Sequence, residues 1–97
     1  MLDINSFTLI LIEGLIDYLK KNQIELDDEA IVEIKENLQK EFFLSFEKQT
    51  KTPTQIINIF LQEHLSPELN ITPKDLGENA LAAILNWGIL KAKYFES

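Results

Sequence analysis

The side chains in this sequence that could take part in catalysis or bind a metal ion are carboxylates and one histidine, His64. A histidine can act as a general base. Here the chain contains no cysteine to serve as a nucleophile, and no serine lies in a nucleophile-elbow motif. A cation near the end of a helix interacts favourably with the free carbonyl groups there. We therefore interpret His64 as a structural residue at a helix C-terminus.

The acidic residues number sixteen, so they must be tested as ligands of a metal ion. The stretch ELDDEAIVE, residues 25–33, lacks the glycine and the alternating oxygen ligands of an EF-hand loop. The histidine has no glutamate three positions before it, as bundle di-metal sites require. Two carboxylate pairs, Glu33 with Glu36 and Asp75 with Glu78, could hold magnesium if they faced each other. We interpret them as solvated residues and caps, and we expect no metal, no cofactor and no enzymatic activity.

The charge of the chain restricts its partners. The net charge is -7, and all nine basic residues are lysine. Proteins that bind nucleic acid gather Lys and Arg to neutralise phosphates, and Arg supplies the bidentate contacts to bases. We therefore expect no binding to nucleic acid or to an anionic membrane surface. The absence of cysteine fits a reducing compartment, and the start MLDINSF lacks the basic region of a signal peptide, so we expect a cytoplasmic protein.

The periodicity of apolar residues predicts an all-α fold in a single helical domain over residues 1–97, without strands. Local residues mark where helices begin: Asp27 or Asp28 as one cap, and Thr52 and Thr72, each followed by proline, as two more. The aromatic end of the second helix, EFFLSFEK, is interpreted as core. We predict a compact antiparallel bundle of four helices, over residues 4–21, 28–48, 53–65 and 73–94.

The last predicted helix is apolar on nearly every side. Its polar interruptions, Asn86 among them, argue against a membrane span, which needs about 20 predominantly apolar residues. Either this helix is the central core helix, or one seam packs inside and the other meets another chain; the second interpretation is preferred. One seam consists of Leu76, Ala80, Ala83, Trp87, Leu90 and Tyr94. The other consists of Leu81, Ile84 or Leu85, Gly88, Ala92 and Phe95.

These patterns predict a small acidic interaction or regulatory module that buries an apolar seam against its own copy, as a homodimer, or against another protein. The predicted contact residues are Ile10, which falls among polar residues of the first helix, and Ile84, Trp87 and Tyr94. The alternative is an inhibitor or immunity-type protein that masks a basic or nucleic-acid-binding surface. Its acidic face would comprise Asp27, Asp28, Glu29, Glu33 and Glu36. Salt separates the two, because it weakens charge pairing but not an apolar seam.

Overall fold

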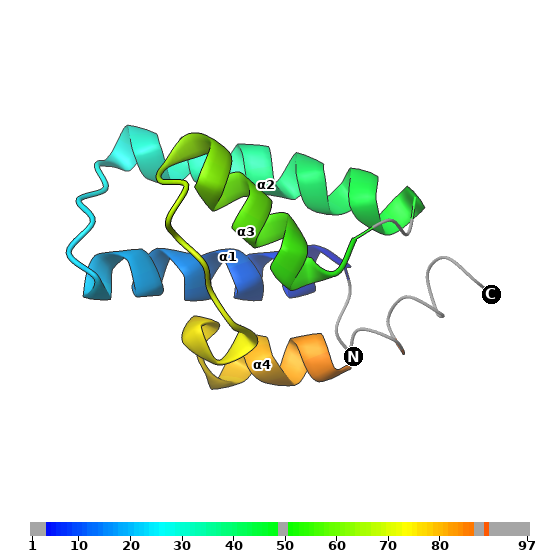
Figure 1. The fold of residues 1–97 in the computed structure, drawn as a ribbon. Helices are drawn as coiled ribbons and strands as arrows, with labels where there is room; N and C mark the ends of the chain where they lie inside the picture. The colour runs from blue at the N-terminus through cyan, green and yellow to red at the C-terminus, as the bar shows by residue number, and fades with distance from the viewer. Residues whose placement is uncertain (1–3, 49–50, 87–88, 90–97) are drawn as a thin grey trace.

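The computed structural model describes residues 4–48, 51–86 and 89, and the described chain is helical without strands. The elements in order are α1 (Ile4–Lys21), α2 (Asp28–Lys48), α3 (Pro53–His64), the short 3-10 turn η1 (Pro73–Leu76) and α4 (Glu78–Leu85). The all-α prediction is confirmed, and the first three helices begin at the predicted residues (Figure 1). Trp87 and Tyr94 lie outside the described residues.

Side chains just before the helices explain where α2 and α3 begin. Asp27 Oδ1 accepts a hydrogen bond of 2.7 Å from the amide of Ala30. Thr52 and Gln55 form a reciprocal capping box: the Gln55 amide donates to Thr52 Oγ1, and the Thr52 amide donates to Gln55 Oε1. Each bond satisfies an amide that has no partner within the helix. The caps predicted at Asp27 and Thr52 are therefore confirmed.

The predicted helix over residues 73–94 is wrong in its first part, because the chain turns at Gly77. Asp75 does reach back to Thr72, accepting from its amide at 2.8 Å and its hydroxyl at 3.2 Å, but it caps only the single turn η1. Gly77 then takes a φ of +94°. That conformation strains side chains other than glycine and cannot continue a right-handed helix. The segment is thus a 3-10 turn followed by a separate helix.

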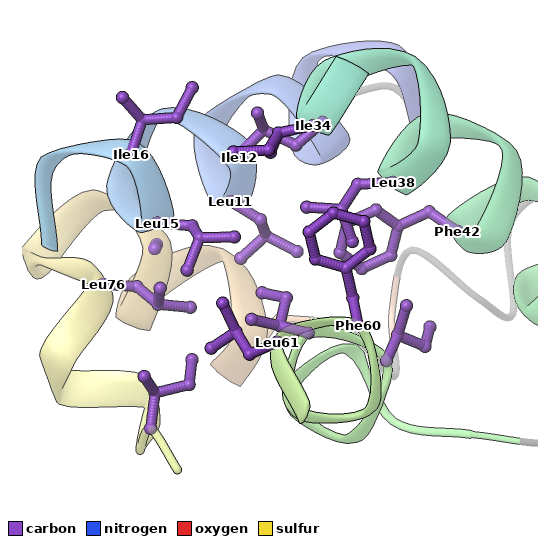
Figure 2. Close-up of a cluster of buried hydrophobic side chains, with 14 of the residues drawn as sticks. Leu11, Ile12, Leu15, Ile16, Ile34, Leu38, Phe42, Phe60, Leu61 and Leu76 are labelled. Carbon is purple, nitrogen blue, oxygen red and sulfur yellow. The ribbon is translucent and has the colours of Figure 1, made fainter. Parts of the chain in front are cut away.

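Helix α1 lies at the centre of the fold. It packs against α2, η1 and α4, whereas α3 packs mainly on α2 (Figure 1). Leu11 and Leu15 of α1 point into a cluster that includes Leu38 of α2 and Leu61 of α3 (Figure 2). The buried apolar residues are Phe7, Leu11, Ile12, Leu15, Ile16, Leu19, Ile34, Leu38, Phe42, Ile56, Ile57, Phe60, Leu61, Ile71, Leu76, Ala80 and Ala83. The sequence is compatible with the last helix as the central helix of the bundle. In the structure the central helix is α1.

A glycine on α1 lets η1 approach closely. A Cβ atom built on Gly14 would lie 3.1 Å from the carbonyl carbon of Leu76, and closer still to its oxygen. Ordinary contacts between carbon atoms are about 3.5–4.0 Å. Gly14 therefore allows the backbone of η1 to pack directly against α1. This close approach buries the side chain of Leu76 in the core.

The connection from α3 to η1 is held in place by side-chain amides of α3. Asn58 Nδ2 donates to the carbonyl oxygen of Ile71 at 3.1 Å, and Asn58 Oδ1 accepts from the Ile71 amide at 2.8 Å. Gln62 Nε2 donates to the carbonyl oxygen of Leu69 at 3.2 Å. The Asn58 pair imitates the pairing of two extended strands and sets Ile71 into the core. Helical periodicity did not predict this clasp.

Candidate protein-binding surfaces

Helix α4 has one buried face and one exposed apolar face. Ala80 and Ala83 are buried where α4 packs against α1. On the opposite side Leu85 is 76% exposed, and Ile89, just beyond the end of α4, is 72% exposed. Ala82, three positions before Leu85, is exposed as well. We call Leu81, Ala82, Leu85 and Ile89 the α4 outer face.

The structure locates two of the four predicted contact residues. Ile10 and Ile84 are both partly buried and pack against the core. The sequence leaves open whether Ile84 or Leu85 belongs to the second seam. In the structure Leu85 faces solvent and Ile84 is turned inward. A role of Ile10 and Ile84 in partner contacts stays a prediction. Ile89 was not singled out from the sequence, although it follows Leu85 at the four-residue spacing of one helix face.

The α4 outer face is poor in charge. Between Leu76 and Leu90, Glu78 is the only charged residue, in a chain that is 26% charged. Single exposed apolar residues are normal on protein surfaces. Here two large aliphatic side chains, Leu85 at the end of α4 and Ile89 just beyond it, are both largely exposed, which makes them a candidate interaction surface.

The predicted acidic residues all lie exposed, in the connection before α2 and along its first half. Glu29, Glu33 and Glu36 follow one another at spacings of four and three residues and so share one side of the helix. A shallow hollow is lined by Asp27, Asp28, Glu29, Ala30, Val32 and Glu33. The structure thus brings together side chains that the sequence placed on a negative face.

A groove between α1 and the second half of α2 was not predicted. It is lined by Asn5 of α1 and by Glu36, Gln39, Lys40, Phe43 and Leu44 of α2. The aromatic end of α2 was expected in the core, and Phe42 is indeed fully buried. Phe43 and Leu44, however, are about half exposed. Neighbouring residues on a helix point about 100° apart, so a run of aromatic residues cannot all face inward.

The histidine lies at a helix C-terminus, as the sequence predicted. His64 is the last residue of α3, is exposed, and stacks against Phe60 with ring centroids 4.6 Å apart. It borders a cleft of about 290 Å³ between α2 and α3, beside Lys40, Lys51 and Glu63. Among the residues that the structure describes, no three His, Asp or Glu side chains are grouped to share a metal ion. The same part of the chain holds no helix long and apolar enough to cross a membrane.

Comparison with known proteins gives no relative: no family model, no curated protein and no solved structure matches this chain.

Proposed function

We propose that this chain is a small non-enzymatic interaction module that associates through the α4 outer face, first of all with a second copy of itself. The observation that carries the proposal is the exposure of Leu85, at the end of a helix whose opposite face is already buried, and of Ile89 just beyond that helix. Two such faces packed together would remove four large aliphatic side chains from water, which is the main driving force for association.

The free energy of the proposed association can be estimated from the exposed fractions of Leu85 and Ile89. Full burial of Leu or Ile is worth about 1.5–3 kcal/mol, and both side chains are about three-quarters exposed. Four of them contribute roughly 6 kcal/mol, which is near the lower end of the cost of association, about 4–15 kcal/mol. A dimer must therefore bury Leu81 and Ala82 as well. We expect it to be weak, with a dissociation constant of about 0.1 mM or higher.

Charge supports a second copy as the partner. Two chains of net charge -7 repel each other, so a symmetric contact is least unfavourable where charge is sparse. The α4 outer face is such a place. The small side chain of Ala82 also lets two helices approach closely when they cross there, and two-fold symmetry requires only one self-complementary patch.

The test is the solution mass over a dilution series, measured by light scattering on a sizing column. We expect a dimer fraction that rises with concentration and is lost in Leu85→Glu. Leu65→Glu is the matched control, because Leu65 is also exposed but lies at the end of α3. A monomer at every concentration would refute self-association, and equal dimerisation of Leu85→Glu would refute the α4 outer face as the contact. Circular dichroism checks that both variants remain folded.

A second candidate function is the masking of a basic or nucleic-acid-binding surface on another protein. It is supported by the exposure of Asp27, Asp28, Glu29, Glu33 and Glu36 along one helix and its start. Such a complex should weaken sharply as salt is added. Binding to a basic target that is unaffected by high salt would contradict this function.

A further inference from the structure

The side of α2 that faces away from the core carries apolar side chains as well as acidic ones. We call this surface the α2 outer face; it comprises Val32, Glu33, Glu36, Gln39, Lys40, Phe43 and Leu44. Ile34, Leu38 and Phe42 fill the core side of the same helix. Phe43 and Leu44 are 46% and 50% exposed, and Val32 is 52% exposed.

The apolar residues of this surface are aligned along the helix. Val32, Glu36, Gln39 and Phe43 follow one another at spacings of four, three and four residues, so they form one row. Leu44 lies beside Phe43, and both line the shallow groove that Asn5 of α1 borders. From Val32 to Phe43 the helix rises about 17 Å, which equals roughly three turns. A row of this length, with apolar Val32 and Phe43 at its ends and the polar residues Glu36 and Gln39 between them, fits an amphipathic helix better than it fits a compact small molecule.

The charges are divided between the two ends of the α2 outer face. The first half carries the exposed residues Glu29, Glu33 and Glu36. In the second half, Phe43 and Leu44 contribute exposed apolar surface, and Lys40 lies beside them. A partner that matches both halves must be basic at one end and apolar at the other. Nucleic acid and a second acidic copy are both disfavoured here by like-charge repulsion.

We propose that the α2 outer face binds a basic amphipathic helix of another protein, lying antiparallel to α2. Its apolar residues pack on Phe43 and Leu44, and its Lys or Arg residues lie in its last turns, against Glu33 and Glu36. This orientation places the positive charges of the partner at its own helix C-terminus, where they are favoured. Lys40 makes the partner position opposite it uncharged or acidic.

This inference deepens the masking function and is independent of self-association through α4. The probe is a synthetic, fluorescently labelled 14-residue helical peptide with leucine in its first half at i, i+3 and i+4 spacing and lysine in its last two turns. A second peptide has every leucine replaced by serine and keeps the same charge. Binding is measured by fluorescence anisotropy with the full chain, at about 20 mM and about 200 mM salt.

Two variants test the geometry, and two more serve as controls. We expect Phe43→Ser to weaken binding of the leucine peptide about tenfold, because the apolar anchor is lost. The double variant Glu33→Lys, Glu36→Lys should weaken binding by about tenfold or more at low salt. Its control is Glu63→Lys, Glu68→Lys, which changes the net charge equally but on α3 and the loop after it. Leu85→Glu should bind as well as the parent chain.

The outcomes distinguish docking of an amphipathic helix on the α2 outer face from charge masking alone. Tighter binding of the leucine peptide than of the serine peptide, lost in Phe43→Ser, supports a helix docked on the groove. Equal binding of both peptides, unaffected by Phe43→Ser, overturns the helix and leaves charge masking standing. If neither peptide binds at low salt, both proposals are wrong. Thermal melting of every variant confirms that the fold is intact.

Discussion

Replacing Gly14 with alanine tests the packing at the centre of the fold, because steric contact and helix propensity predict opposite effects. Gly14 lies within α1, where alanine is normally more stable than glycine by about 1 kcal/mol. The added methyl group would, however, lie 3.1 Å from the carbonyl carbon of Leu76. The obstacle is backbone, so it cannot yield by changing a rotamer. The turn η1 must move away from α1 instead.

The size of the effect follows from what η1 holds. Overpacking of this kind costs about 1–3 kcal/mol, and partial loss of the burial of Leu76, which is 4% exposed, adds a further fraction of about 1.5–3 kcal/mol. After the gain in helix propensity, we expect Gly14→Ala to lower the free energy of unfolding by about 1–3 kcal/mol. For a domain of this size that is a fall in Tm of roughly 4–8 °C per kcal/mol.

The assay is chemical unfolding in urea, followed by circular dichroism and by the thermal midpoint. Glu13→Ala is the control, because Glu13 is the exposed neighbour on the same helix and should change stability by less than about 0.5 kcal/mol. If Gly14→Ala raised the unfolding midpoint, propensity alone would govern this position. The close approach of η1 to α1 would then be incorrect.

Three further substitutions test the connections between helices, each by the urea midpoint. Asn58→Asp keeps an acceptor for the Ile71 amide but loses the donor to its carbonyl oxygen, and we expect a loss of about 1–3 kcal/mol; an unchanged midpoint would mean that the clasp is not formed. Thr52→Ala removes the acceptor for the Gln55 amide and should cost about 1 kcal/mol, whereas Thr52→Ser should cost little. Gly77→Ala should cost about 1–2 kcal/mol, because the φ of +94° is unfavourable for alanine even though no atom lies within 4 Å of the added Cβ; a more stable variant would contradict this backbone conformation.

The contrast between Thr52 and Gly77 explains how far the sequence predicts the fold. The start of α3 depends on Thr52, Pro53 and Gln55, which are neighbours in the chain, so local reasoning is enough. The break at Gly77 accompanies the packing of η1 on Gly14, more than sixty positions away. A pattern of apolar residues continues smoothly through Gly77 and does not register that contact. The clasp of Asn58 on Ile71 was unpredictable for the same reason.

The candidate surfaces also combine features that local sequence predicts with features that depend on long-range packing. The acidic stripe of α2 was predictable, because charge and helical spacing are both local properties. The exposure of Phe43 beside the buried Phe42 was not, since it depends on the direction from which α1 and α3 approach α2. Likewise, two apolar seams could be recognised on the last helix, but their assignment to core and solvent required the position of α1.

The central position of α1 leads to a distinct prediction about salt. Helix α1 covers one side of α4 and leaves the charge-poor α4 outer face exposed. The acidic α2 outer face is exposed as well. Association through α4 brings together two chains of net charge -7, so salt should screen their repulsion and strengthen the dimer. Binding of a basic helix to α2 should respond in the opposite direction. Light scattering and peptide anisotropy on one preparation, from about 20 to about 200 mM salt, measure both. If both associations weakened together, charge pairing would drive both and the apolar contact through Leu85 would be wrong.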